Sequence, residues 1–345
     1  MQTGVRVGVL IGGPSPEYEV SRATADNILL ALEQLGYMIR PILVTPDQSW
    51  YVYANPEAYR ANEYDEAFGV RDAVERLPHL IDVAIIAMHG KFGEDGGIQR
   101  LLDQAGLPYQ GSGVRASRLA FDKHATSQVL RRSGIAVPDY TMIERSRWVA
   151  ARARIIRQSV AAYGLPVIIK PNASGSSIGV SIARTVNELT EALELASAKY
   201  DRVIVQQYVA GHEVSCGILE RDGTTMALPP TLIRYAKKSF FDYRAKYTAK
   251  VTEVITPAPF SSSTQKAIMQ YAFGVHKILK LQGYSRVDMI LARRRLWVLE
   301  ANTLPELTNH SLFTQSAAVA GIDFSSLVNE LVQHALTRPE VVELS

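Results

Sequence analysis

The sequence predicts a multidomain α/β protein whose later domains have α+β character. The chain has 345 residues, which is longer than one hydrophobic core usually serves, and 47% of them are hydrophobic, enough for two or three cores. In the first third, β-rich apolar runs alternate with segments whose apolar residues recur at helical spacing. We expect three domains, at residues 1–111, 112–205 and 206–345.

The first domain opens as a strand, a loop and a helix. Residues 5–11 are β-rich, the glycine- and proline-containing run 12–16 breaks the strand, and apolar residues at helical spacing follow. Further apolar strands are predicted at 39–44 and 83–88. Strands that alternate with helices favour a parallel sheet, whose ligands bind beyond the carboxyl ends of the strands. Residues 50–79 have no clear period and are interpreted as an elaboration of this domain.

The second domain is predicted to be a small α+β module. A helix is expected over 117–133 and, after a turn, a second helix that runs to Arg157. A strand follows at 167–170, and Pro171 ends it. A glycine- and serine-rich loop leads to a further strand at 179–182. Because glycine lets a backbone approach closely, the N–H groups and hydroxyls of this loop suit a phosphate. The spacing matches neither a P-loop nor a dinucleotide-binding motif, so an ordinary hairpin turn stays open as the alternative.

The third domain contains most of the remaining strands. We predict them at 203–208, 213–219, 286–291 and 296–302. Residues 234–259 form a long stretch rich in Lys, Tyr and Phe without a regular pattern, which is typical of a functional loop or lid. A helix is expected where apolar residues keep one face, at Ile268, Ala272, Val275 and Leu279.

The last two predicted strands carry oxygen ligands at a spacing that suits a metal ion. Because side chains alternate along a strand, Arg286 and Asp288 share a face, and so do Glu300 and Asn302. Hard oxygen ligands without nearby His or Cys favour magnesium, which leaves other positions to phosphate and water. A solvated hairpin is the alternative. Interleaved apolar residues indicate a packed sheet face instead and favour the metal site: Val287, Met289, Val298 and Leu299.

Three lysines lie beside these motifs. Lys170 ends the strand before the glycine-rich loop, Lys123 lies in the helical region before it, and Lys246 lies in the long stretch. Each offers a point charge to phosphate oxygens. Taken singly, each is most simply a surface lysine, and only the position beside the motifs indicates phosphate binding.

Charge and composition argue against several other classes of protein. The formal charge of +3 comes from 37 basic and 34 acidic residues spread along the chain, so no basic face indicates a nucleic-acid partner. The single cysteine, Cys216, cannot form an intramolecular disulfide or a paired-cysteine zinc site. No apolar run reaches the ~20 residues that span a bilayer, and the N-terminus has no signal-peptide pattern. We therefore expect a cytoplasmic protein without a membrane partner.

Eight short motifs occur in an order and spacing that together are highly specific. They are Gly12–Ser21, His89–Gly96, Leu107–Gly113, Asp122–Lys123, Lys170–Pro171 with the Gly-Ser-Ser loop, Phe241–Tyr247, Arg286–Asp288 and Glu300–Pro305. With them the chain resembles the D-alanine–D-alanine ligases of the ATP-grasp superfamily over nearly its whole length. The resemblance implies a three-domain ATP-grasp fold, with an N-terminal parallel-sheet domain, a small central domain and a C-terminal antiparallel-sheet domain that holds the metal site and the lid.

The resemblance implies that ATP lies between the central and C-terminal sheets. The matching nucleotide-binding residues are Lys123, Lys170, Ser177, Gln206, Tyr208 and Glu213, with the two lysines on the phosphates, Glu213 on the ribose and residues 206–208 beside the adenine. By the same likeness Asp288, Glu300 and Asn302 hold two Mg²⁺ ions, with Mn²⁺ as an alternative, and Lys246 assists from the lid.

The implied reaction forms an acyl phosphate that an amine then attacks. Arg286 would stabilise the tetrahedral oxyanion, a kind of contact typically worth about 3–4 kcal/mol of barrier. Glu17 matches the residue that binds the ammonium of the first amino acid, and Ser176 and Tyr247 match its partners, which position and deprotonate the second. Closure over the site would protect the acyl phosphate from water. Further matches to substrate-binding positions are Val20, His89, Ser311 and Leu312, the last two on the carboxylate of the acceptor.

Two positions depart from the family pattern. Glu306 stands where glycine is usual, beside the implied oxyanion and acceptor site. A carboxylate there would repel an acceptor carboxylate and favour a cationic or carboxylate-free amine, unless its side chain points outward. Gln206 stands where an acidic residue beside the adenine is common; its amide oxygen still accepts a hydrogen bond, so we expect ATP binding to persist.

Three functions fit these residues. The resemblance implies ATP-dependent formation of D-alanyl-D-alanine from small amino acids for peptidoglycan precursors, by a homodimeric enzyme. A divergent dipeptide or amide ligase with a different acceptor amine is the second, and only Glu306 separates the two in the sequence. A nucleotide-binding regulator without turnover is the third. The matches at the metal ligands, at Arg286 and at the lysines argue against it.

Overall fold

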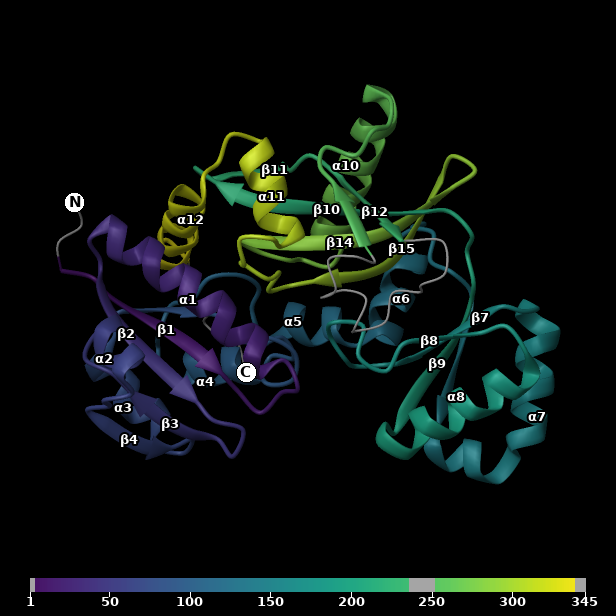
Figure 1. Ribbon diagram of the computed structural model, residues 1–345, viewed down its shortest axis with the longest axis horizontal. Coiled ribbons are helices and arrows are strands. Elements are labelled where there is room, and N and C mark those ends of the chain that lie inside the picture. The colour runs from purple at the N-terminus through teal and green to yellow at the C-terminus, as the bar shows by residue number, and fades with distance from the viewer. Residues whose placement is uncertain (1–3, 236–251, 339–345) are drawn as a thin grey trace.

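The computed structural model of the protein describes residues 4–235 and 252–338. Figure 1 shows the N-terminal sheet at one end of the molecule, a small sheet at the other end, and a large antiparallel sheet between them. The predicted α/β class with later α+β domains is thereby confirmed. Lys246 and Tyr247 lie outside the described residues. No helix in the described part of the chain is both long and apolar enough to cross a membrane.

The N-terminal sheet has a parallel centre and an antiparallel flank, in the order β4-β3-β2-β1-β5. The parallel strands are those predicted: β1 (Arg6–Gly12), β2 (Met38–Val44) and β5 (Val83–Ile86). The segment without a clear period adds β3 (Ser49–Val52), α2 (Pro56–Ala61), β4 (Glu66–Gly69) and α3 (Ala73–Leu80). The sheet is therefore mixed rather than wholly parallel, since β3 and β4 pair antiparallel. Neither strand is buried along its whole length, as suits antiparallel strands with one face toward solvent.

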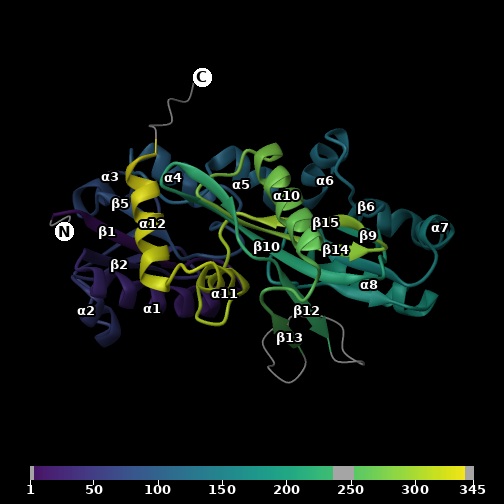
Figure 2. The same cartoon turned by 90° about the horizontal axis from the view of Figure 1, so that it is seen from above.

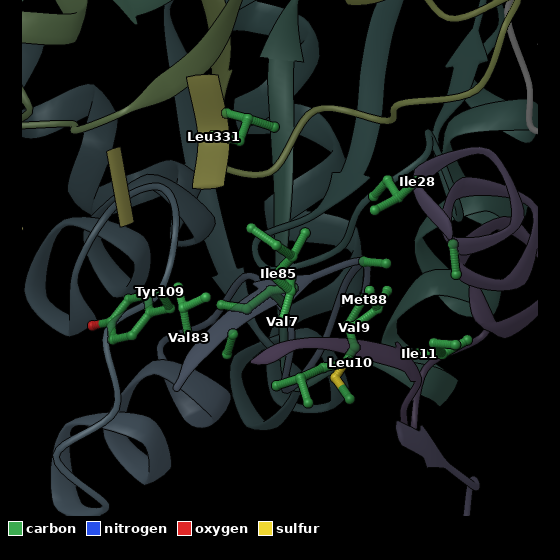
Figure 3. Packing of buried hydrophobic residues seen from close by; sticks show 14 of the residues in the cluster. Val7, Val9, Leu10, Ile11, Ile28, Val83, Ile85, Met88, Tyr109 and Leu331 are labelled. Atoms are coloured by element: carbon green, nitrogen blue, oxygen red, sulfur yellow. The ribbon is translucent and has the colours of Figure 1, made fainter. Parts of the chain in front are cut away.

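Helices from both ends of the chain cover the N-terminal sheet. α1 (Tyr18–Leu35) follows β1, α4 (Gly97–Gln104) follows β5, and α12 (Phe324–Leu336) packs against α1 and β5. Figure 2 shows α12 lying over the strands of this sheet. Leu331 of α12 belongs to the same buried cluster as Ile28 of α1 and Ile85 of β5 (Figure 3). The last described helix therefore completes the core of the first domain.

The central sheet is antiparallel, in the order β6-β9-β7-β8. Its strands and helices are β6 (Tyr140–Glu144), α7 (Arg145–Tyr163), β7 (Val167–Pro171), β8 (Ser181–Ala183), α8 (Val186–Lys199) and β9 (Arg202–Gln207). The strand predicted to open the third domain at 203–208 belongs here instead. Val203 and Val205 of β9 pack in one buried cluster with Val167 and Ile169 of β7, which holds β9 in the central sheet.

The C-terminal sheet is antiparallel, in the order β13-β12-β10-β14-β15, with β11 paired to β10. Its elements are β10 (His212–Arg221), β11 (Thr224–Ala227), β12 (Thr231–Tyr235), β13 (Thr252–Ile255), α10 (Ser262–Ile278), β14 (Tyr284–Ala292), β15 (Arg295–Asn302) and α11 (Leu312–Val319). The stretch predicted to be irregular at 234–259 is regular at its start and near its end. There β12 pairs with β13, for example Arg234 opposite Glu253. Cys216 is buried in β10.

Two short helices replace the single one predicted over 117–133. α5 (Val114–Phe121) and α6 (Lys123–Arg132) are separated at Asp122, whose side chain accepts a hydrogen bond from Ala125 N at 2.9 Å and caps α6. Ala120 and Leu130 of these helices are buried in the core of the C-terminal sheet. The break places Lys123 at the start of α6.

A half-buried cluster of one glutamate and two histidines joins α12 and α10 to the C-terminal sheet. The Glu220 carboxylate accepts a hydrogen bond from Gly283 N at 2.9 Å and lies 3.1 Å from His334 Nε2 and 3.6 Å from His276 Nε2. Nδ1 of the fully buried His276 lies 2.8 Å from Ser285 Oγ. Burial alone would raise the pKa of Glu220, but the two histidines and the Gly283 N–H hold that pKa below its ordinary value.

Glu220→Gln is expected to destabilise the protein at neutral pH and progressively less in acid. Losing a charged acceptor of hydrogen bonds costs about 2 kcal/mol. Because the folded-state pKa is lowered, this contribution is present above the ordinary pKa of glutamate and is lost as the pH falls toward the folded-state value. Thermal unfolding of both proteins between about pH 7 and about pH 3 measures the difference.

The matched control is Glu33→Gln, since Glu33 forms an exposed ion pair with Arg60 at 2.7 Å and should contribute less than about 1 kcal/mol at any pH. A stability difference for Glu220→Gln that stayed constant below about pH 4.5 would contradict the role assigned to its charge.

Candidate active site

The central and C-terminal sheets face each other across a cavity of about 420 Å³, to which loops of the N-terminal domain contribute. Most of the predicted site residues line it, and they come from all three domains. They are Glu17, His89, Lys123, Lys170, Ser176, Ser177, Gln206, Tyr208, Glu213, Arg286, Asp288, Glu300, Asn302, Glu306 and Leu312. Residues that are far apart in the chain therefore meet in one place, as the resemblance implies.

Two predicted substrate residues do not line the cavity. Val20 is half-buried in the first turn of α1 and is absent from the lining. Ser311 is the N-cap of α11: its Oγ accepts a hydrogen bond from Thr314 N at 3.4 Å and donates one to Glu306 O at 2.7 Å. The hydroxyl of Ser311 is therefore occupied by backbone groups, and its contribution here is to hold the chain at Glu306.

Asp288 and Glu300 are brought together by the pairing of β14 with β15. Asp288 lies directly opposite Glu300, and Arg286 lies opposite Asn302. The register then shifts between Asp288 and Met289, so Val298 and not Leu299 lies opposite Met289. The shift explains why Leu299 lines the cavity, although it was predicted with the apolar residues of the packed face.

The Asp288 carboxylate is surrounded by donors. Arg286 donates to it from Nε at 2.9 Å and from Nη2 at 2.8 Å. Asn302 Nδ2 also donates to it, at 3.0 Å, and so does Ser215 Oγ, at 2.6 Å. Burial alone would lower the pKa of Arg286, but the charge and hydrogen bonds of Asp288 raise it above its ordinary value. The guanidinium therefore stays charged, and its Nη1 is left without an acceptor within the described ranges.

Lys123 joins Glu300 to the glycine-rich loop. Its Nζ lies 3.0 Å from Glu300 Oε2 and donates to Ser174 O at 2.7 Å. Although burial alone would raise the pKa of Glu300, the charges of Lys123 and Lys170 hold it below its ordinary value. The carboxylate is thus ionised and already faces cations.

The donor set fits Mg²⁺. Among the described residues no group of three or more His, Cys, Asp and Glu side chains is arranged to hold a metal. Asp288, Glu300 and Asn302 instead supply two carboxylates and one amide. Such a partial oxygen set is typical of magnesium, which completes its coordination with phosphate oxygens and water.

The Ser174–Ser177 loop reaches across to the N-terminal domain. Ile178 N donates to Gly175 O at 3.0 Å, and the two residues between, Ser176 and Ser177, have left-handed φ values of 45° and 57°. Two adjacent non-glycine residues in this region are costly and are often found at functional sites. The turn directs Ser176 Oγ to donate to the Glu17 carboxylate.

Glu17 is a buried carboxylate at the N-terminus of α1, 4% exposed. A Cβ atom on Gly175 would lie 2.6 Å from Glu17 Oε2, so the loop approaches this closely only because residue 175 is glycine. His89, also in the lining, has its Nε2 3.0 Å from Thr24 Oγ1 of α1. Glu17 lies at the start of α1 and His89 contacts Thr24 of α1, so this helix positions both N-terminal residues predicted to contact the first amino acid.

Glu94 is a buried carboxylate of the cavity that the sequence patterns do not single out. Its Oε2 accepts a hydrogen bond from Gly90 N at 2.7 Å. Burial, followed by the nearby charge of Glu17, raises the pKa of Glu94 above its ordinary value. Its place within the His89–Gly96 motif was the one available signal.

Lys170 lies in β7 on the face of the central sheet that lines the cavity, and is 7% exposed. Burial and the charge of Lys123 lower the pKa of Lys170 to about 8, while Glu300 raises it. Within the described ranges, its ammonium has no acceptor. An anionic ligand would supply one.

Models of the D-ala D-ala ligase family match the chain in two parts, the N-terminal model at residues 6–112 and the C-terminal model at residues 129–333. The D-alanine–D-alanine ligase of Syntrophobacter fumaroxidans is 37% identical over 336 residues, covering 96% of this chain and 97% of its own. The chain belongs to the D-alanine–D-alanine ligase family. Its predicted membership of an ATP-dependent ligase family with the ATP-grasp fold is thereby confirmed.

Solved structures of this family share the whole fold. The D-alanine–D-alanine ligase of Bacillus anthracis complexed with ATP has a TM-score of 0.75 at 29% identity and covers 96% of this chain and 98% of its own. The VanG D-Ala:D-Ser ligase of Enterococcus faecalis has a TM-score of 0.81 at 29% identity and covers 96% of this chain and 99% of its own. Ligases that are named for different second amino acids therefore share this fold.

Proposed function

We propose that the protein joins two molecules of D-alanine at the expense of ATP, in the cytoplasm, to supply a peptidoglycan precursor. The observation that carries this proposal is the convergence of Lys170, Lys123 and Arg286 with two carboxylates and a buried Glu17 in one cavity. The cations suit a triphosphate, and Glu17 suits an ammonium group. Family membership supports the same substrates.

The proposed reaction has two steps. A carboxylate oxygen of the first D-alanine attacks the γ-phosphorus of ATP, the bond to the β,γ-bridging oxygen breaks, and D-alanyl phosphate and ADP form. The second D-alanine loses a proton from its ammonium group, its amine attacks the carbonyl carbon, and inorganic phosphate leaves with the bonding electrons. The products are D-alanyl-D-alanine, ADP, phosphate and a proton.

Different side chains would bind the phosphates of ATP and the first D-alanine. Lys123 and Lys170 would hold phosphate oxygens, and Glu17 would hold the ammonium of the first D-alanine. Asp288, Glu300 and Asn302 would hold Mg²⁺, which when bound neutralises phosphate charge.

Arg286 would stabilise the oxyanion of the second step through Nη1, the nitrogen that Asp288 leaves unused. The roles predicted for Lys246 and Tyr247 fall outside the described residues and stay predictions, as does the homodimer, which light scattering would check.

The test is a phosphate-release assay with ATP and magnesium across D- and L-amino acids, offered singly and in pairs. Release that needs D-alanine and yields D-alanyl-D-alanine by mass spectrometry is the expected result. If phosphate were released with D-alanine only in the presence of a different amine, D-alanine would still be the donor and that amine would be the acceptor. No release with any amino acid would overturn the proposal.

A second candidate, a ligase with a different acceptor amine, is favoured by one observation. Glu306 lines the cavity, and its negative charge contributes to the raised pKa of Arg286, behind Asp288. Ser311 Oγ fixes the backbone at this residue. A carboxylate that faces the acceptor would disfavour an amine that carries its own carboxylate.

Glu306→Gly is therefore expected to widen acceptor use or shift it toward amino acids with a free carboxylate. Removing one like charge near the acceptor carboxylate should change relative kcat/KM by about 10-fold, the scale of a partly screened charge pair. A screen of amines that contrasts D-alanine with D-alaninamide measures this, and Glu306→Gln separates charge from size. Identical profiles for all three proteins would show that Glu306 does not set specificity.

A further inference from the structure

Gln206 is a buried residue whose side chain carries an amide into the cavity. It lies in β9, is 5% exposed and lines the cavity. Its side-chain amide has no hydrogen-bond partner within residues 4–235 and 252–338. A buried amide is normally paired, because leaving it unpaired costs free energy. A ligand in the cavity would be the partner.

The strand register shows which part of a nucleotide would reach this amide. Gln206 lies directly opposite Ile168 of β7, and Lys170 lies two residues further along β7. Residues two apart in a strand, and residues directly opposite across a ladder, share a face. Lys170 and Gln206 therefore face the same cavity, separated by about 7 Å along the strand direction.

The surroundings of Gln206 suit a flat base. Ile168 lies directly opposite Gln206, and the lining of the same cavity includes three further apolar side chains: Val180, Leu232 and Leu299. Apolar walls that lead to a single polar group are typical of a pocket for an aromatic ring whose edge is hydrogen-bonded. With phosphates at Lys170 and Lys123, the edge of the base would meet the Gln206 amide.

We propose that Gln206 lets this ligase accept 6-oxopurine nucleoside triphosphates, such as ITP and GTP, in addition to ATP; this rests on the nucleotide-dependent function proposed above. A carboxamide carries both an acceptor and donors, and a rotation of its end group exchanges them. It can accept from the 6-amino group of adenine or donate to the 6-oxo group of hypoxanthine or guanine. A carboxylate at the same place would only accept, so it would pair with adenine and repel the 6-oxo oxygen.

The experiment compares the affinity for ATP, ITP and GTP by titration calorimetry, in the presence of magnesium and without amino acids, in the wild-type protein and in Gln206→Glu. The wild-type protein is expected to bind ITP within about 10-fold of ATP, and Gln206→Glu to raise the preference for ATP by about 100-fold. GTP adds a 2-amino group and shows whether the pocket also admits it. Undetectable ITP binding to the wild-type protein, or an unchanged preference in Gln206→Glu, would overturn the proposal.

Two further variants keep the result interpretable. Gln206→Met removes both hydrogen-bonding groups at similar size and should weaken ATP and ITP by comparable factors, whereas Gln206→Glu alone should change the preference between them. Gln104→Glu makes the same change in charge at an exposed position of α4, outside the cavity, and should leave the preference within about 2-fold.

Turnover with D-alanine is measured in parallel. If ATP and ITP bind as expected but D-alanine gives no product, the proposed reaction fails while the inference about Gln206 stands. If the protein ligates D-alanine in the presence of ATP but does not bind ITP, the inference about Gln206 fails and the proposed reaction stands.

Discussion

Glu300→Gln and Asp288→Asn are each expected to lower kcat by roughly 10²- to 10⁴-fold with the fold retained, because each removes a negative charge from the group that would hold Mg²⁺ beside the phosphates. The two carboxylates lie directly opposite each other on β14 and β15. The substitutions keep the size of the side chains and remove only charge and acceptor capacity.

Glu300→Gln is the cleaner of the two variants. Asp288 also accepts both hydrogen bonds of the Arg286 fork, so Asp288→Asn disturbs a second functional group. Steady-state phosphate release measures kcat, and thermal unfolding confirms that each variant is folded. Magnesium titration by calorimetry in the presence of a non-hydrolysable ATP analogue adds a readout that does not depend on turnover.

The matched control is Glu330→Gln, which removes a carboxylate paired with Arg221 at 3.2 Å outside the cavity. Its kcat should equal that of the wild-type protein. Near-normal turnover in Glu300→Gln or in Asp288→Asn would refute the assignment of these side chains as metal ligands.

Arg286→Lys is expected to lower kcat by about 10²- to 10³-fold with little change in the KM for ATP. Arg286 is 8% exposed and pairs with Asp288 through Nε and Nη2, which leaves Nη1 available to the cavity. Lysine keeps the charge but is a single point donor, so it cannot pair with Asp288 and hold an oxyanion in the same geometry. The loss should appear in kcat because the oxyanion exists only during the reaction.

Arg6→Lys is the matched control for this substitution. Arg6 also forms a forked pair with a carboxylate, from Nε at 3.2 Å and Nη2 at 2.7 Å to Asp82, in the N-terminal domain and away from the cavity. It should cost some stability and leave kcat unchanged. If Arg286→Lys instead raised the KM for ATP and spared kcat, Arg286 would be a nucleotide-binding residue and its assignment to the oxyanion would be wrong.

Much of the site follows from local patterns in the sequence. The alternation of side chains in two strands is enough to place Asp288 and Glu300 together, because antiparallel pairing brings the same faces of neighbouring strands into contact. The parallel strands of the first domain are recognisable for a similar reason, since fully buried strands are continuous apolar runs.

Local patterns do not predict which sheet a strand joins or which face a side chain takes when these depend on the pairing of strands. Residues 203–208 are apolar and β-rich in any sheet, and their place in the central sheet depends on pairing with β6 and β7. Leu299 is apolar like a core residue, but it is the extra residue of β15 at the register shift between Asp288 and Met289, and it lines the cavity. Ser311 matches a substrate-binding position, yet its hydroxyl caps α11 and holds Glu306.

The sequence by itself determined most of the strands and the chemical types of the functional side chains, because propensity, period and motif spacing are local properties of the chain. Only the tertiary structure decided which charges meet. The contact of Lys123 with Glu300, the burial that raises the pKa of Glu94 and the burial of Gln206 each depend on surfaces from different domains. Hydrogen bonding and dielectric environment are set by the atoms that surround a group in space, which are not its neighbours in sequence.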